Sequence, residues 1–268
     1  MTGHPDASLG DAIRAALLQS DPRAKVFAAR GVARDWRTGR LAFDLSAPVP
    51  DEPARPARPE LLPPGRMPKR GKAGSERGRI ALWHALAHIE FVAIDLALDI
   101  VGRFGRDMPR AFADDFLGVA ADEAMHFALL ERKLTKLGSH YGALPAHAGL
   151  WDAARRTAHD VAARLAVVPM VLEARGLDVT PTTIERVERA GDPDGVRILE
   201  RILDDEIRHV GIGARWFDEV SASRDEMPRE LWQNLVRTHF GGSLKAPFND
   251  SARRTAGLPR DFYAGLVS

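Results

Sequence analysis

The sequence predicts an all-α protein built on a four-helix bundle, with a helical, proline-rich extension before the bundle and a helical extension after it. Two observations predict this fold. Long stretches with apolar residues at helical spacing follow Gly78, and glycines separate them. The motif Asp-Glu-x-x-His occurs twice, at 122–126 and 205–209, and each copy follows a lone glutamate at the same interval, as two repeated helical hairpins would place it.

Two short amphipathic helices are expected at 8–19 and 22–34, the second because Pro22 suits the first turn of a helix. The stretch 47–68 contains eight prolines, which exclude a helix or a central strand. We therefore expect extended chain running over a surface there, as a linker or a strap.

Basic residues gather between residues 55 and 79, where the chain has eight basic and two acidic residues. Such a segment can contact the phosphates of RNA. It has no aromatic residue on which bases could stack, so a solvated basic segment is the favoured interpretation and an RNA contact is the alternative.

The first hairpin is expected from 80–103, which is apolar on all sides and ends near Gly102, and from 109–137, which ends at Gly138. The connection 139–149 is longer than a tight turn needs. In extended form it is long enough to cross along the bundle.

The second hairpin is expected from 150–175, ending at Gly176, and from 194–220. Between them, Thr180-Pro181 suggests the start of a short helix. A helix near 229–240 and a last short helical segment are expected to pack back on the bundle. The predicted segments are thus an N-terminal extension at 1–75, the bundle at 76–222 and a C-terminal extension at 223–268.

Six residues on these four helices form a candidate metal site. Residues three apart on a helix project from one face, so the glutamate and histidine of each Glu-x-x-His can bind one metal together. A single glutamate lies 33 residues before each motif glutamate (123 − 90 and 206 − 173), and its carboxylate can bridge or balance two cations. The predicted ligands of this dinuclear site are Glu90, Glu123, His126, Glu173, Glu206 and His209.

A lone Glu-x-x-His pair on a helix is more often a solvated side-chain contact than a pair of ligands. Two copies among apolar neighbours such as Ile89, Phe91 and Met125 favour the metal site, because converging buried carboxylates need positive charge between them. Core salt bridges are the alternative interpretation.

Two aspartates precede the motif glutamates and are candidate supports for the histidines. A histidine that binds a metal usually donates its second N–H to a carboxylate or a carbonyl. We expect Asp122 to hold His209 and Asp205 to hold His126 across the bundle. The alternative is that both aspartates are exposed helix residues.

Other residues near the site are expected to play supporting roles. Pro169, four residues before Glu173, predicts a kink or a widened turn beside the site. His84 and His88 share one face of their helix, and His88 points away from the direction of Glu90. Both histidines are therefore expected to be structural or to support the ligands.

Five segments carry a family resemblance: His84-Ala-Leu-Ala-His88-Ile-Glu90, Asp122-Glu-Ala-Met-His126-Phe, Leu172-Glu173-Ala-Arg-Gly-Leu-Asp178-Val-Thr-Pro181, Asp205-Glu-Ile-Arg-His209-Val and Lys245-Ala-Pro-Phe-Asn249. Together they make the chain, from about residue 60 to 265, resemble a bacterial family of ferritin-like proteins described mainly as a domain of unknown function. The resemblance implies a ferritin-like fold. It further implies that Glu123 and Glu206 bridge the metals and that Glu90 and Glu173 are terminal ligands.

Composition narrows the chemistry further. The 268 residues include no cysteine, which excludes disulfides, cysteine-bound zinc, cysteine-bound iron–sulfur centres and a thiol nucleophile. A net charge of +1 gives no overall preference for nucleic acid, membranes or anionic substrates. The first residues do not resemble a signal peptide, and no run of eighteen apolar residues occurs, so a cytoplasmic protein with no membrane partner is expected.

The expected function is oxidation of an organic substrate by dioxygen or peroxide at two iron ions, with manganese or a mixed manganese–iron pair as the alternative cofactor. The small-molecule substrate is not identified, and modification of tRNA is one subclass, because ferritin-like tRNA hydroxylases exist. A monomer or a homodimer is expected. The alternatives are a protein that oxidises and handles iron without an organic substrate, and a metal-free scaffold.

Overall fold

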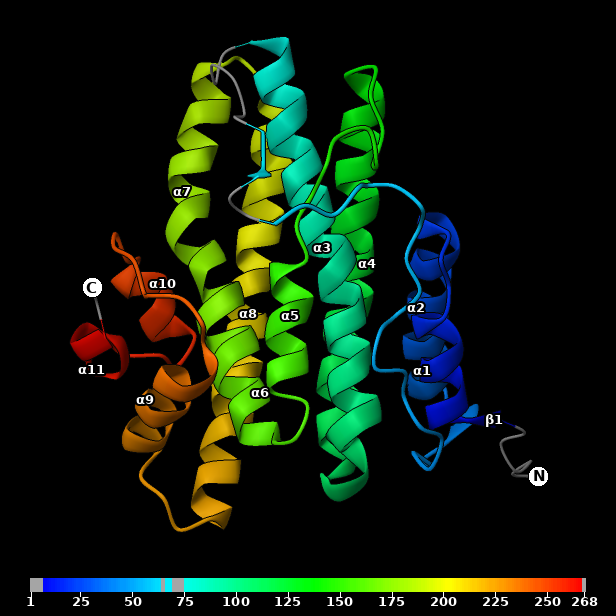
Figure 1. Ribbon diagram of the computed structural model, residues 1–268, viewed down its shortest axis with the longest axis vertical. Helices are drawn as coiled ribbons and strands as arrows, with labels where there is room; N and C mark the ends of the chain where they lie inside the picture. Colours follow the sequence, from blue (N-terminus) through cyan, green and yellow to red (C-terminus); the bar gives the residue numbers. More distant parts are fainter. Residues whose placement is uncertain (1–6, 64–65, 69–74, 267–268) are drawn as a thin grey trace. The chain divides into compact units, whose positions relative to one another are not determined.

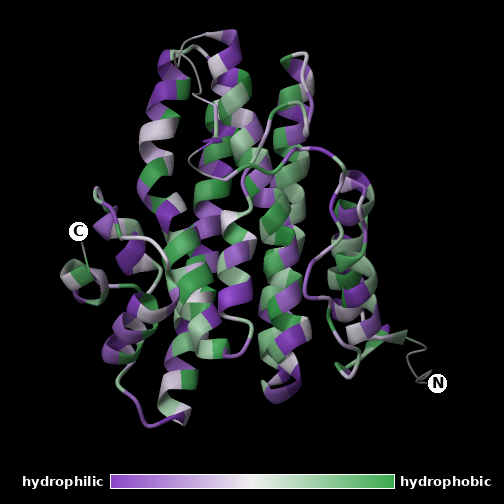
Figure 2. Ribbon diagram, in the orientation of Figure 1, coloured by the Kyte–Doolittle hydropathy of each residue, from purple (hydrophilic) through white to green (hydrophobic). Residues whose placement is uncertain are grey.

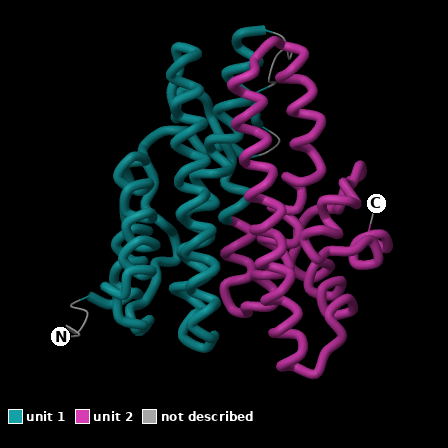
Figure 3. The backbone as a smooth tube through the Cα atoms, turned by 180° about the vertical axis from the view of Figure 1, so that it is seen from behind, with its two compact units in different colours: residues 1–151 teal, residues 152–268 magenta. Residues whose placement is uncertain are grey.

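The computed structural model describes residues 7–63, 66–68 and 75–266, and within them the prediction of an all-α fold is confirmed. The paired strands of this part of the chain are β1 (Ala7–Ser8) and β2 (Leu41–Ala42), which run parallel. The chain forms two compact units, residues 1–151 and 152–268 (Figure 3). Because the predicted four-helix bundle takes one helix pair from each unit, that arrangement and the three predicted segments stay predictions.

The first unit is built around two long antiparallel helices, α3 (Glu76–Phe104) and α4 (Arg110–Lys136), joined by the short turn η2 (Gly105–Asp107) (Figure 1). The hydroxyl of Ser75 caps α3 by accepting the N–H of Gly78. Every residue of α3 from Glu90 to Gly102 is buried. Hydrophobic residues accordingly predominate through the middle of this helix (Figure 2), as its sequence predicts.

A layer of two shorter helices covers α3 and α4 in the same unit. These are α1 (Leu9–Leu17) and α2 (Pro22–Arg37). Asp21 caps α2, and Pro22 occupies its first turn, as the sequence predicts. The chain then returns along α3 as extended backbone between residues 43 and 63.

This extended segment is a strap held by backbone hydrogen bonds. Gly10 N–H donates to Asp44 O (2.8 Å), Ala54 N–H to Leu17 O (2.9 Å), and Leu62 N–H to Ala146 O (2.8 Å). A β-carbon at Gly102 would lie 2.4 Å from the Val49 side chain, so the strap sits directly against α3 at that glycine. The predicted proline-rich stretch thus runs over the surface of its own unit, as far as it lies within the described residues.

The second unit contains a second long antiparallel pair, whose first member is interrupted. Its helices are α6 (Val161–Val167), the π-helix η3 (Val168–Glu173), α7 (Ala174–Arg189) and α8 (Pro193–Ser223), preceded by α5 (Gly149–Arg156), which begins in the first unit. A single helix over 150–175 was expected. Instead the chain turns after α5, where the Arg164 guanidinium donates to Ala154 O (2.7 Å) and to the Thr157 hydroxyl (3.0 Å).

The helix that carries Glu173 also runs further than expected, through Gly176 and Pro181 to Arg189. A proline inside a helix leaves the carbonyl four residues earlier without its usual donor. Here that carbonyl, Leu177 O, accepts the side-chain amide of Asn249 (3.2 Å). The C-terminal segment therefore supplies the hydrogen bond that Pro181 removes, and no new helix starts at this proline.

The C-terminal residues pack against helices of the second unit. They form α9 (Pro228–His239), α10 (Asp250–Thr255), α11 (Arg260–Tyr263) and η4 (Ala264–Leu266). The buried guanidinium of Arg253 on α10 is held by Asp178 of α7 (2.7 Å). In the part of the chain described, none of the helices has the length and apolar character needed to cross a bilayer.

Candidate metal centre

Three of the six predicted ligands meet inside the first unit. Glu90 comes from α3, and Glu123 and His126 come from one face of α4. They are 4%, 1% and 0% exposed, respectively. His126 Nδ1 lies 3.3 Å from Glu90 Oε2 and 3.4 Å from Glu123 Oε2, and the ligand atoms of the three side chains all lie within 4.8 Å of one another. This buried group can hold a metal ion.

The electrostatics of this group show why a cation fits it. Burial, followed by repulsion from Glu123, raises the pKa of Glu90 well above its usual value, and His126 opposes that rise. Burial lowers the pKa of His126, but its contacts with Glu123 and Glu90 outweigh burial and raise it to about 11. In the absence of metal, His126 therefore holds its proton, and Glu90 takes up a proton more readily than an ordinary glutamate does. A divalent cation bound between the two carboxylates would reduce their mutual repulsion more than a singly charged imidazolium does.

The other three predicted ligands belong to the second unit. Glu206 and His209 lie on α8, with Glu206 Oε1 3.7 Å from His209 Nδ1. The His209 side chain is fully buried and that of Glu206 is 12% exposed. Glu173 is the last residue of the π-helix and is half-buried. The second Glu-x-x-His thus repeats the geometry of a carboxylate and an imidazole on one helical face.

The π-helix lies where Pro169 predicts a widened turn, and that prediction is confirmed. The opposite helix approaches it at Gly213. A β-carbon there would lie 2.4 Å from Pro169 Cβ and 2.5 Å from Pro169 Cγ. Pro169 is four residues before Glu173, and Gly213 is four residues after His209, so in this antiparallel pair the contact sets Glu173 and His209 at one level.

Gly213→Ala is therefore expected to destabilise the protein by about 1–3 kcal/mol, because the rigid proline ring cannot move aside as a flexible side chain would. Gly211→Ala is the matched control on the same helix, since its β-carbon would meet Ala256 only at 3.7 Å. That control should be neutral or gain up to about 1 kcal/mol from helix propensity. Equal denaturant midpoints for the two variants would show that the contact with Pro169 does not constrain α8.

Comparison with known proteins gives the chain a family. The profile of the family described as "Protein of unknown function (DUF455)" matches residues 18–264. The chain belongs to the DUF455 family. A relative from Haemophilus influenzae, described as "Uncharacterized protein", is 43% identical over 222 residues, which is 81% of this chain and 77% of that protein. No solved structure matches the chain. The description of the DUF455 family gives no activity.

The two aspartates beside the motif glutamates have different surroundings in this DUF455 chain. Asp205 accepts hydrogen bonds from Arg201 Nε (2.7 Å) and from an Arg208 nitrogen (3.3 Å), both on its own helix. Asp122 is half-buried on α4. The expected supports, Asp122 for His209 and Asp205 for His126, each join the two units and stay predictions.

His84 and His88 of α3 hold the loop that follows α4. His84 Nε2 accepts the N–H of Gly142 (2.9 Å). His88 Nε2 donates to His147 O (3.0 Å), so its Nδ1 accepts the hydroxyl of Tyr141 (2.9 Å). Both imidazoles are thus neutral, and burial lowers the pKa of each to about 4. The expected structural role of the two histidines agrees with these bonds.

The stability of metal-free protein is expected to fall as the pH is lowered from about 6.5 to about 4, in part because of His84. Unfolded histidine takes up a proton near pH 6.5, whereas folded His84 does so only near pH 4, so acid favours the unfolded state within this window. His84→Gln keeps an acceptor but cannot titrate there. Thermal unfolding at pH 7 and pH 5 should show a smaller loss for His84→Gln than for the wild type, and equal losses would contradict the assignment.

Sequence reasoning missed a buried ion pair in the same DUF455 unit. Lys25 of α2 binds Asp95 of α3, and both side chains are fully buried. Asp99, one turn later, is also buried and pairs with Arg103 (2.8 Å). The signal was present in the sequence, because two aspartates four residues apart interrupt an otherwise apolar helix.

Proposed function

We propose that this DUF455 protein binds two metal ions, iron or alternatively manganese or a mixed pair, and uses dioxygen or peroxide to oxidise an organic substrate. One observation carries the proposal: two buried carboxylates converge with a buried imidazole in the first unit, and the Glu-x-x-His of the second unit repeats the donor set. The proposed ligands are Glu90, Glu123, His126, Glu173, Glu206 and His209.

The donor set suits iron or manganese better than other common metals. Carboxylate oxygen and imidazole nitrogen are the ligands of non-haem iron and manganese, and the chain has no thiolate to select zinc or copper(I). Four carboxylates would balance the charge of two divalent ions. When bound, such a metal pair supplies the electrons that reduce dioxygen or peroxide.

The protein's own residues have three tasks in this proposal. Glu90 and Glu123 provide negative charge in a site that excludes water. His126 must lose its proton to bind a metal, so binding should release protons and strengthen as the pH rises. The π-helix that ends at Glu173 alters the spacing of backbone groups beside the site, as π-helical turns frequently do at functional sites.

The test separates an oxidase from an iron-handling protein. Anaerobic protein is given increasing ferrous iron and then dioxygen, while oxygen uptake and particle size are followed. An oxidase should stop after about two iron ions per chain unless a reductant is added. Continued oxidation of many irons per chain, with growth of a large particle, would instead support iron handling.

RNA remains a substrate proposal with weaker support. Residues 64–65 and 69–74 of the basic segment 55–79 lie outside the described residues. Arg55 packs over the Trp151 ring (5.8 Å), and its terminal nitrogens are buried, so it is withdrawn from phosphate contact. A gel shift with tRNA at low salt that is lost on neutralising Arg58 and Arg77 would support RNA binding, and the absence of any shift would reject it.

A further inference from the structure

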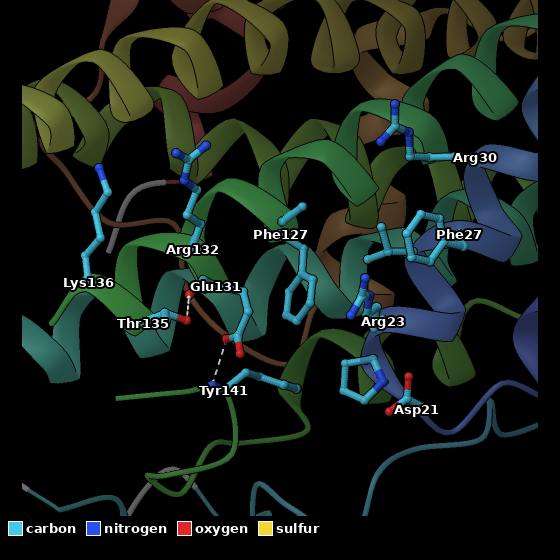
Figure 4. A pocket seen from close by; sticks show the side chains of 13 residues that line it. Asp21, Arg23, Phe27, Arg30, Phe127, Glu131, Arg132, Thr135, Lys136 and Tyr141 are labelled. Carbon is cyan, nitrogen blue, oxygen red and sulfur yellow. Dashed lines mark hydrogen bonds between the residues drawn. The ribbon is translucent and has the colours of Figure 1, made fainter. Parts of the chain in front are cut away.

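The first unit contains a second concave site, separate from the buried ligands. It is a cavity of about 760 Å³ between α2 and α4, partly open to solvent, and Figure 4 shows the side chains that line it. Tyr141, from the loop after α4, closes part of it. A volume of this size lies in the range of pockets that hold small organic molecules.

The walls of the cavity are largely apolar. Val26 and Phe27 line it from α2, and Phe127 and Ala128 line it from α4. Phe27 is 60% exposed at the rim, although a large aromatic side chain gains free energy by leaving water. An apolar part of a ligand would cover this ring.

The charges around the cavity are mostly positive. Its four basic and two acidic residues are Arg23, Arg30, Arg132, Lys136, Asp21 and Glu131. Both acids are engaged, since Asp21 accepts the N–H of Ala24 (2.8 Å) and Glu131 accepts the N–H of Tyr141 (2.8 Å). Figure 4 shows Arg30, Arg132 and Lys136 directed to one side of the cavity, with Asp21 and Glu131 on the other.

We propose that this cavity binds an organic anion with an apolar chain, such as a fatty-acid-like carboxylate. The carboxylate would lie on the side to which Arg30 and Arg132 point, and the chain would lie against Phe27 and Phe127. A nucleotide fits less well, because the polar groups that would read a base edge are engaged within the protein, including the Thr135 hydroxyl, which donates to Glu131 O (3.0 Å).

One wall of the cavity belongs to the helix that carries Glu123 and His126. Phe127 directly follows His126, and its ring lies 5.2 Å from that of Phe91, which directly follows Glu90. The bound anion could then be the organic substrate of the metal site, an idea that rests on the proposed function. Binding of the anion in the cavity is independent of that function.

The experiment is calorimetric titration of the protein with dodecanoate below its micelle concentration. Dodecyltrimethylammonium, with the same chain and opposite charge, and acetate, which lacks the chain, are the reference probes. We expect one dodecanoate per chain, at least about tenfold tighter than the ammonium, and no measurable binding of acetate. Equal affinity for the anion and the cation would overturn the proposal.

Two variants locate the site. Phe27→Glu should weaken dodecanoate binding at least about tenfold, whereas Met227→Glu, at another exposed apolar residue in the second unit, should not. Arg30→Gln combined with Arg132→Gln should weaken it about three- to tenfold, against no change for Arg254→Gln, because exposed ion pairs are individually weak. Identical affinities for Phe27→Glu and Met227→Glu would overturn the assignment of this cavity.

Two further measurements distinguish anion binding from metal binding and from self-association. Glu123→Gln should lose metal but still bind dodecanoate, so failure of the metal proposal does not remove the cavity's ligand. Light scattering tests a second copy of the chain as the occupant. A dimer that Phe27→Glu converts to a monomer, together with no dodecanoate binding, would overturn the proposal in favour of self-association.

Discussion

Glu123→Gln is expected to lower the affinity for iron or manganese at least about tenfold, because it removes a charged ligand from the buried group at the centre of the first unit. Glutamine keeps the size of the side chain and loses its negative charge. Metal content by mass spectrometry and the rise in unfolding temperature on adding metal both measure the effect. The wild type should be stabilised by metal in proportion to the logarithm of its concentration, and the variant should need at least about ten times more metal for the same stabilisation.

Two further variants serve as comparisons for Glu123→Gln. Glu206→Gln, on the second Glu-x-x-His, should lose metal to a similar extent, because the proposed site needs both motifs. Glu200→Gln is an exposed carboxylate on the same helix and should bind metal like the wild type. Unchanged metal content in Glu123→Gln would show that Glu123 is not a metal ligand, and absence of metal from both proteins would favour the metal-free scaffold.

Lys25→Met is expected to destabilise the protein by about 3–5 kcal/mol, the usual cost of leaving one buried charge without its partner. Burial raises the pKa of Asp95 to about 6 against the opposing pull of Lys25, so the carboxylate is ionised at pH 7. Without the ammonium group it must take up a proton or remain charged in an apolar core. Urea unfolding at pH 7 measures the loss.

The double variant Lys25→Met with Asp95→Leu should recover most of that stability, since replacing both partners by apolar residues is often nearly neutral. Arg34→Met breaks an exposed pair with Asp35 on the same helix and should cost far less stability than Lys25→Met, because water screens an exposed ion pair. If Lys25→Met lowered the free energy of unfolding no more than Arg34→Met does, the buried pair would not stabilise the packing of α2 on α3.

Local signals in the sequence were enough to predict most of the helices. The long apolar stretches gave α3, α4 and α8 within a few residues of their observed ends, because glycines and prolines mark those ends directly. The widened turn at Pro169 was also predictable, because a proline within a helical pattern removes a hydrogen bond wherever it occurs.

Most of the features that escaped prediction depend on residues distant in sequence. The helix through Pro181 continues because Asn249 supplies a donor from 68 residues further along (249 − 181), which no local window contains. The break after α5 depends on Arg164 reaching back to Ala154. Likewise, Lys25 and Asp95 are 70 residues apart. Within the candidate site, motif spacing identified Glu90, Glu123 and His126, whose proximity the structure shows.

Metal analysis of the wild-type protein decides whether the buried carboxylates and imidazoles form a metal centre. Protein purified without chelators from cells supplied with iron and manganese should contain about two metal ions per chain, and the reduced protein should change its optical absorption when exposed to dioxygen. Purified protein that contains no iron or manganese, and that shows no stabilisation when either metal is added, would contradict a metal centre.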